Sequence, residues 1–414
     1  MDVWIITVGE PLPGFSGSAR PWRSGALAAV LARREHKVTW WTSSVDHFSK
    51  TQWVQQSSTH TAGQNLQLQF LHGCLYHRNV SLARYRNHRQ IAQEFLRLAD
   101  DRKPPDLILC SYPTIELSEA AVTYARARRI PAYLDIRDLW PDEILTRIPV
   151  PARPLGRLAL TPLYRAARHA MRGATGLIGI SQAYLEWGLR LAERGASPHD
   201  HVIPLGYTGN LDRIVPGPVV EHRLREMGVD PDKRIFWFSG TFVGNIDLGT
   251  VIEAARQLAD RDDIQFVFSG SGEREKKWCD QARGLGNVVF TGWVGSEDLA
   301  WLSGVARVGL AAYKPGATMS LPNKLFEYMS MGLPVLLSLG GEAAQLVTDN
   351  GLGDVYRAGD PRHLADLIKQ RSGDVDWHAA CSRRARALFQ SEFAMDTLYQ
   401  RYADILEDRA RRGA

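Results

Sequence analysis

A short segment near residue 322 combines a helix start with one basic and one acidic side chain. Pro322 is typical of the first helical position and a glycine follows residue 331, so the sequence predicts a helix over residues 322–331. The N–H groups at the start of a helix attract phosphate, and Lys324 lies in that first turn. Asn323, Lys324 and Glu327 share one face, which could present Glu327 to ribose hydroxyls. The alternative is an amphipathic helix with a surface Lys–Glu pair.

Two loops that follow predicted strands could also approach an anionic ligand. Glycines allow close backbone approach in Gly270-Ser271-Gly272, for which an ordinary turn is the alternative. Residues 10–25 form a long loop that opens into a helix. Gly17 permits a tight backbone approach there, and Arg20 and Arg23 could bind an anion. The alternative is a solvated loop.

Residues 149–176 contain five arginines and no acidic residue: Arg153, Arg157, Arg165, Arg168 and Arg172. Leucines and alanines lie between them, and a helix from Thr161 would align Leu163, Ala167 and Met171. A basic amphipathic element is typical of a contact with an anionic membrane surface. The alternative is a surface helix that packs on its own domain. The patch could extend to Arg84, Arg86, His88 and Arg89.

Short apolar strands alternate with helical segments along the whole chain, which predicts parallel sheets covered on both faces. Strands are expected near residues 3–8, 38–42, 106–110, 132–136, 176–180 and 202–204, and a second series begins at residue 234. This pattern predicts an α/β protein with two Rossmann-like domains, residues 1–208 and 209–376, followed by a helical segment over 377–414. Ligands of such sheets bind at the C-terminal strand ends, so we expect the site in a cleft between the domains.

Composition excludes several classes of protein. The chain has 414 residues with 50 Lys and Arg against 45 Asp and Glu, and its charge is uneven: +8 over residues 1–208 and −3 over the rest. This asymmetry favours an anionic partner for the first half. No membrane-spanning segment, nucleic-acid-binding signature or metal-ligand spacing is present, and the four scattered cysteines suggest a reducing cytoplasmic compartment.

The segment PNKLFEYMSMGLPV, residues 322–335, resembles the donor-binding helix of GT-B glycosyltransferases of family 4. Related stretches occur in the same order at residues 238–241 with Asn245, at 266–273 and at 289–294. Residues 135–142 resemble the bacterial O-antigen, capsule and exopolysaccharide members of the family. The resemblance covers nearly the whole chain.

The resemblance implies a GT-B fold whose second domain binds a nucleotide-diphosphate sugar, with the C-terminal helix crossing back onto the first domain. Trp293 would flank the nucleobase, unless it is a core residue. The donor residues would be Gly17, Gly240, Thr241, Asn245, Gly270, Ser271, Gly272, Trp293, Val294, Ser320, Leu321, Pro322, Asn323, Lys324 and Glu327.

On the acceptor side, the resemblance points to Asp138, whose carboxylate could orient or deprotonate an acceptor hydroxyl. The alternatives are a helix N-cap and a partner for Arg137. Arg20, Arg23 and His47 are further acceptor candidates, although His47 could be an ordinary surface histidine. GT-B enzymes generally need no metal, so none is expected, and Asp374 and Asp376 are not assigned to one.

Two departures from the family pattern concern the donor. The family often has two glutamates with seven residues between them; here Glu327 is the second, and Met319 occupies the first of these positions. The basic pair that many members place after the Gly240 strand is absent, so Lys324 and backbone amides near Gly240, Thr241 and Asn245 must hold the diphosphate.

We therefore expect a retaining hexosyltransferase that acts on a glycan or lipid-diphosphate acceptor in bacterial surface polysaccharide synthesis, cytoplasmic or peripheral at the inner membrane face. The alternatives are a GT-B nucleotide-sugar epimerase, a non-catalytic member of a polysaccharide assembly complex, and a dinucleotide-dependent oxidoreductase. The last is disfavoured because the first strand is not followed by G-x-G-x-x-G.

Overall fold

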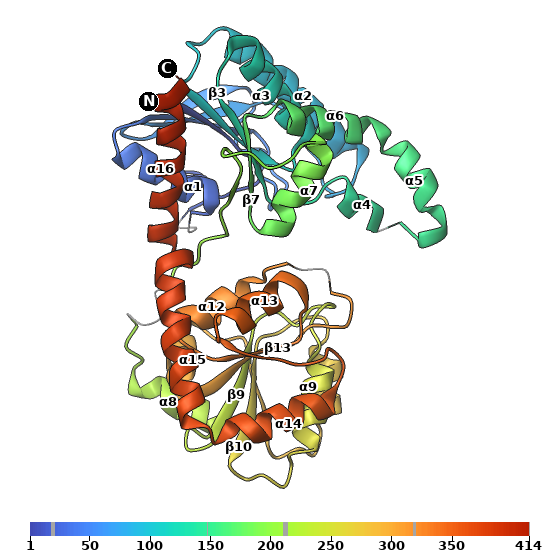
Figure 1. Ribbon diagram of the computed structural model, residues 1–414, viewed down its shortest axis with the longest axis vertical. Helices are drawn as coiled ribbons and strands as arrows, with labels where there is room; N and C mark the ends of the chain where they lie inside the picture. Colours follow the sequence, from blue (N-terminus) through green and yellow to red (C-terminus); the bar gives the residue numbers. More distant parts are fainter. Residues whose placement is uncertain (18–20, 147, 210–213, 318–319, 414) are drawn as a thin grey trace. The chain divides into compact units, whose positions relative to one another are not determined.

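The computed structural model describes residues 1–17, 21–146, 148–209, 214–317 and 320–413. The chain forms two compact units: unit 1 comprises Met1–Leu205 and Leu398–Ala414, and unit 2 comprises Gly206–Thr397. Each unit is built on a sheet of parallel or mostly parallel strands flanked by helices (Figure 1). The predicted α/β class with two Rossmann-like units is confirmed.

Unit 1 has an eight-stranded sheet in the order β3-β4-β2-β1-β5-β6-β7-β8, in which only the β3–β4 pair is antiparallel. Its central strands are continuous apolar runs because helices cover both faces, and Val3, Ile5 and Ile6 are fully buried. The strands are β1 (Asp2–Ile6), β2 (Lys37–Ser43), β3 (Ser58–Gly63), β4 (Leu66–Leu71), β5 (Leu107–Tyr112), β6 (Ala132–Ile136), β7 (Gly176–Gly179) and β8 (His201–Val202).

The helices of unit 1 pack on both sides of this sheet. On one side, α2, α3 and α6 lie side by side, and α1 lies on the other, next to the last helix of the chain (Figure 1). The helices are α1 (Arg23–Arg33), α2 (Leu82–Asp100), α3 (Ile115–Arg128), α4 (Asp142–Thr146), α5 (Arg153–Ala159), α6 (Thr161–Gly173) and α7 (Gln182–Ala192), with a 3-10 turn at Val150–Ala152.

Unit 2 has a six-stranded, fully parallel sheet in the order β11-β10-β9-β12-β13-β14. Its strands are β9 (Arg234–Ser239), β10 (Ile264–Ser269), β11 (Val288–Gly292), β12 (Ala306–Ala311), β13 (Val335–Leu337) and β14 (Gly353–Val355). Its helices are α8 (Pro218–Glu226), α9 (Leu248–Arg256), α10 (Glu275–Gln281), α11 (Ser296–Val305), α12 (Asn323–Met331), α13 (Gly341–Asp349), α14 (Pro361–Ser372) and α15 (Val375–Leu388).

The boundary between unit 2 and the C-terminal helical segment lies later in the chain than the sequence predicts. Helix α15 and the π-helical turn Phe389–Phe393 belong to unit 2, not to a separate segment from residue 377. The reason is apolar burial: the ring of Phe393 lies 4.8 Å from that of Phe326, and both are in the unit 2 core. Helix α16 (Met395–Gly413) joins unit 1 from Leu398 onward, where Arg34 pairs with Asp404 at 2.7 Å.

Candidate functional site

The loops that follow β9, β10 and β11 are joined to one another by backbone hydrogen bonds. The N–H of Gly240 donates to the carbonyl of Ser269 at 2.9 Å, and the N–H of Gly270 donates to the carbonyl of Gly292 at 2.7 Å. The C-terminal ends of three parallel strands therefore form one surface in unit 2, at the edge where such sheets bind ligands.

Glycine is required in these loops because the backbones touch. Gly270 has φ +147°, and a Cβ atom there would lie 1.9 Å from the carbonyl oxygen of Gly240. A Cβ at Gly240 would lie 2.7 Å from Lys324 Nζ. Packing between neighbouring loops thus explains the glycine at position 270, which agrees with the expectation of an ordinary turn there. The glycine at position 240 instead leaves room for the Lys324 ammonium.

Helix α12 begins at this surface with an open N-terminus. Pro322 has extended backbone angles and is the N-cap, so the helix starts at Asn323, one residue later than predicted. Among the residues that the structure describes, no side chain caps this end. Backbone N–H groups at an uncapped helix start are a ready anion site.

Lys324 brings a buried ammonium group to the same place. Its Nζ donates to the carbonyl of Ser239 and lies 4.2 Å from the ring centroid of Phe238. The side chain is 9 % exposed, and burial lowers its pKa to about 8, an effect that the charge of Glu327 opposes. The surface Lys–Glu pair considered above is therefore wrong, because this cation is inside the protein.

Glu327 lies one turn further along α12. Burial raises its pKa, and the charge of Lys324 acts in the opposite direction. The side chain is only partly buried, and no described residue is hydrogen-bonded to its carboxylate. Such a carboxylate can accept hydrogen bonds from two neighbouring hydroxyl groups.

The other predicted donor residues differ in how far their side chains are exposed to solvent. Trp293 is 72 % exposed, so the alternative that it is a core residue is wrong. Thr241 and Asn245 are exposed, and the Asn245 carbonyl accepts from Lys314 N at 3.0 Å. Val294 and Leu321 are less exposed. Met319 lies outside the described residues.

One acidic neighbour was not predicted from the sequence. The hydroxyl of Ser320 donates to a carboxylate oxygen of Glu342, in the first turn of α13. This contact brings a second carboxylate close to the start of α12, although 22 residues separate the partners in the chain. The local sequence around Glu342 gave no signal, because the contact is tertiary.

In unit 1, Arg23 does not face an acceptor, which corrects the prediction. It is 3 % exposed, and its Nε and Nη2 atoms donate to Asp135 at 2.8 and 2.9 Å. The third donor, Nη1, binds the carbonyl of Pro204 at 2.7 Å. A buried carboxylate on β6 needs a buried cation, so this arginine is held in the interior.

The start of α1 is also occupied. The Glu10 carboxylate accepts from the N–H of Ser24 at 3.0 Å and of Gly25 at 3.3 Å, and it pairs with Arg137. This helix terminus therefore has its anion within the protein. Gly17 lies in the loop before it with φ +60° and open space around it, and Arg20 lies outside the described residues.

Asp138 follows β6 and accepts from the N–H of Leu139 at 2.9 Å. Arg137 binds Asp135 and Glu10, and α4 begins at Asp142. His47 Nδ1 is hydrogen-bonded to the Tyr76 hydroxyl at 2.8 Å. Burial and then the charge of Arg84 lower the pKa of His47 to about 4, so it is neutral at pH 7.

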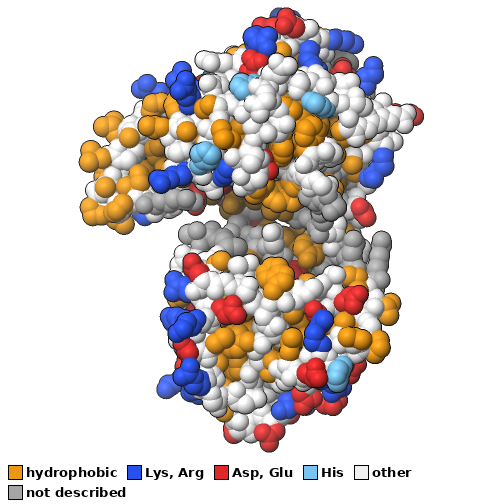
Figure 2. Space-filling view, turned by 180° about the vertical axis from the view of Figure 1, so that it is seen from behind, with side chains coloured by type: hydrophobic (Ala, Val, Ile, Leu, Met, Phe, Trp, Pro, Cys, Tyr) orange, Lys and Arg blue, Asp and Glu red, His pale blue; other side chains and the backbone are white. Residues whose placement is uncertain are grey.

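The arginine-rich segment divides into two different helices. The predicted apolar face of α6 is buried, with Ala167 and Met171 at 0 % exposure, so α6 packs on its own unit as the alternative stated. On α5, by contrast, Leu155 and Leu158 are 72 and 71 % exposed. Figure 2 shows hydrophobic side chains gathered on this projecting part of unit 1, with basic side chains beside them.

The described residues contain neither a metal-binding cluster nor a membrane-spanning helix. No group of three or more His, Cys, Asp or Glu side chains in that part of the chain could hold a metal ion, and Asp374 instead caps α15 by accepting from Trp377 N at 2.9 Å. No helix within the same residues is long and apolar enough to cross a bilayer.

Several solved structures are similar to this one over almost the whole length of the chain. HepE of Anabaena in complex with UDP has a TM-score of 0.67 at 18 % identity, over 99 % of this chain and 100 % of that one. Sucrose-phosphate synthase of Thermosynechococcus elongatus has a TM-score of 0.63 at 16 % identity, over 98 % of both chains. WaaG, a glycosyltransferase of lipopolysaccharide biosynthesis, has 0.59 at 17 %, over 97 and 99 %. The fold is that of the GT-B glycosyltransferases.

The GT-B fold predicted from the sequence is confirmed. Residues 233–374 also match the model of the family described as glycosyl transferases group 1. That range contains the β9, β10 and β11 loops and the whole of α12. No curated protein is significantly similar to the chain.

Proposed function

We propose that the protein is a retaining glycosyltransferase that transfers a hexosyl group from a nucleotide diphosphate to a glycan or lipid-linked acceptor. The observation behind this proposal is the buried, carboxylate-free contact of Lys324 beside the uncapped start of α12, within a segment that matches a glycosyltransferase family. This ammonium is buried against a carbonyl and an aromatic ring, and the charge of Glu327, one turn away, compensates it only in part. A diphosphate would supply an opposite charge in direct contact.

In this proposal each group at the site acts on a different part of the donor. The α12 N–H groups and Lys324 bind the diphosphate and stabilise the charge that develops on it as the sugar leaves. Glu327 accepts hydrogen bonds from the ribose, and the exposed Trp293 ring packs on the base. HepE has been solved with UDP and with UDP-glucose, which makes UDP the first nucleotide to test.

Asp138 is our candidate for orienting the acceptor hydroxyl, because it follows β6 at the ligand-binding edge of the unit 1 sheet. We further propose that α5 contacts an anionic membrane surface through Leu155 and Leu158, with Arg165 and Arg168 adding charge. An acceptor held at a membrane surface is consistent with a role in surface polysaccharide synthesis. The structurally similar WaaG is a glycosyltransferase involved in lipopolysaccharide biosynthesis.

A thermal-shift panel of UDP, GDP, TDP and ADP tests the donor proposal. One nucleotide at 100 times its dissociation constant should stabilise the protein by about 2.7 kcal/mol, a shift of roughly 5 °C. At the same nucleotide concentration the shift should fall to about half or less in Lys324→Met and remain in Lys276→Met, whose side chain is 93 % exposed on α10. No shift with any nucleotide would favour a non-catalytic protein instead.

Vesicle sedimentation tests the membrane contact separately. Anionic vesicles should bind the wild type more strongly than a Leu155→Ser/Leu158→Ser variant, while neutral vesicles should bind both weakly. Lys276→Glu/Arg283→Glu, two exposed sites on unit 2, controls for general charge. Equal binding of wild type and the double serine variant would remove α5 from the proposal.

A further inference from the structure

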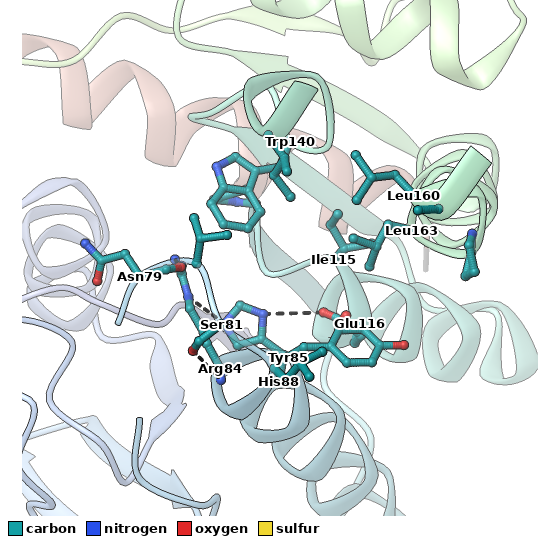
Figure 3. Close-up of a pocket in the computed structure, with 16 residues that line it drawn as sticks. Asn79, Ser81, Arg84, Tyr85, His88, Ile115, Glu116, Trp140, Leu160 and Leu163 are labelled. Carbon is teal, nitrogen blue, oxygen red and sulfur yellow. Dashed lines mark hydrogen bonds and ion pairs between the residues drawn. The ribbon is translucent and has the colours of Figure 1, made fainter. Parts of the chain in front are cut away.

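Unit 1 contains a pocket of about 430 Å³ that the donor proposal does not use. Figure 3 shows it between the start of α2, the start of α3, Trp140 after β6, and Leu160 and Leu163 at the α5–α6 junction. Its volume lies in the range of small-molecule sites, about 300–1,000 Å³. It adjoins the end of β6, where Asp138 is located.

Most of the pocket wall is hydrocarbon. Ile115, Ile144, Leu160 and Leu163 line it together with the Trp140 ring. The wall is open at one side, because Leu82 at the start of α2 is 86 % exposed. An exposed leucine at the rim and an apolar interior favour an apolar ligand group that enters from solution or from a lipid surface.

Arg84 gives this apolar pocket one fixed positive charge. Its guanidinium lies 4.8 Å from the Trp140 ring centroid, and Nη1 donates to the Asn79 carbonyl at 2.7 Å. Nε donates to His88 Nε2 at 3.3 Å, and His88 Nδ1 lies 3.4 Å from Glu116. Because Nε2 accepts from Arg84, Nδ1 is the ring nitrogen that can donate to Glu116.

This chain of contacts orients Arg84, and the charges of Asp138 and Glu116 act on it from beyond ion-pair distance. Within the described residues, no carboxylate lies within ion-pair distance of its guanidinium, and Nη2 has no hydrogen-bond acceptor. A partly buried arginine of this kind is suited to a phosphate group, which can accept two parallel N–H bonds.

The pocket is also continuous with the exposed part of α5. Ala159 and Leu160 form its wall, directly after the exposed Leu158. The exposed apolar side chain of Leu158 therefore lies next in the chain to residues that line the pocket.

We propose that this pocket binds the proximal hydrocarbon chain of a lipid phosphate acceptor, with Arg84 bound to the phosphate. This inference rests on the proposed function, because it names the acceptor class of the same enzyme. It predicts that chain and charge are both needed for binding: a lipid phosphate binds, while the chain alone or the phosphate alone binds at least tenfold more weakly.

Calorimetric titration with farnesyl diphosphate, farnesol and inorganic pyrophosphate tests this. Arg84→Gln should weaken the binding of farnesyl diphosphate at least tenfold. Leu82→Asp should weaken it by a similar factor, because it places a negative charge at the rim of the pocket. Arg86→Gln, an exposed arginine two residues further along α2 and absent from the pocket wall, should bind like the wild type.

Because every variant here lies in unit 1, the far-UV circular dichroism spectrum and the urea unfolding curve of each variant serve as the folding control. Lost farnesyl diphosphate binding with wild-type spectrum and unfolding curve supports the pocket. The inference is overturned if pyrophosphate competes as well as farnesyl diphosphate, or if Arg84→Gln binds farnesyl diphosphate like the wild type. Loss of the nucleotide shift in the wild type would instead count against the proposed function alone.

Discussion

Replacing Lys324 by methionine should have opposite effects on the empty protein and on nucleotide binding. Burial lowers the pKa of this lysine from 10.5 to about 8. A difference of that size corresponds to about 3 kcal/mol. Because the folded state binds fewer protons than the unfolded state between these pH values, the free energy of unfolding decreases as the pH falls from 10.5 to about 8, and this loss is complete below it.

Methionine has a similar length and no charge to desolvate. Lys324→Met should therefore raise the free energy of unfolding at pH 7, by up to about 3 kcal/mol. The same change removes a charged hydrogen bond to the diphosphate, worth about 1.5–3 kcal/mol. Nucleotide affinity should fall by roughly 10- to 150-fold as a result.

The pH dependence separates this lysine from other causes. Above its pKa of about 8 the free wild-type protein loses the ammonium, so affinity should fall by as much as about tenfold per pH unit. Lys324→Met should lack that dependence. Urea unfolding and calorimetric titration at pH 7, 8 and 9 measure both effects, with Lys276→Met as the matched control. A variant that is less stable and binds normally would refute the reasoning.

Three further changes test the surrounding groups. Glu327→Gln should lower the affinity for a ribonucleotide about tenfold but leave the affinity for its 2′,3′-dideoxy analogue nearly unchanged. Calorimetric titration with both nucleotides measures the difference, and equal losses of affinity would contradict ribose binding by Glu327. Glu10→Ala should lower the free energy of unfolding by about 3 kcal/mol, because it uncaps α1 and removes a buried partner of Arg137, and should leave nucleotide affinity unchanged. Although burial opposes it, the charges of Arg23 and Arg137 lower the pKa of Asp135 below 3.8, so stability should fall as the pH drops below 4. Asp135→Asn should have a shallower slope in acid denaturation.

The local patterns were enough to predict the fold. Helix α12 could be predicted to within one residue because Pro322 and Gly332 fix its two ends through their own backbone preferences. The buried parallel strands were predicted because their runs are apolar without interruption. The β3–β4 hairpin was missed: β3 is an edge strand whose exposed face carries polar residues such as Thr59 and Thr61, and it lacks the apolar run of a central strand.

The site could be predicted where its chemistry is local and not where it depends on tertiary contacts. Lys324 and Glu327 are one turn apart, so their spacing alone groups them. Arg23 could not be assigned correctly, because Asp135 lies 112 residues away and nothing near Arg23 indicates the pair. The Ser320–Glu342 contact and the Arg84–His88–Glu116 chain were missed for the same reason.

The most direct test of the central claim is a crystal structure of the protein with the nucleotide diphosphate that stabilises it best. The account predicts the diphosphate at the start of α12, within hydrogen-bond distance of backbone N–H groups there and of Lys324 Nζ, with the ribose on Glu327. A diphosphate bound elsewhere on the chain, with α12 and Lys324 left unchanged, would contradict it.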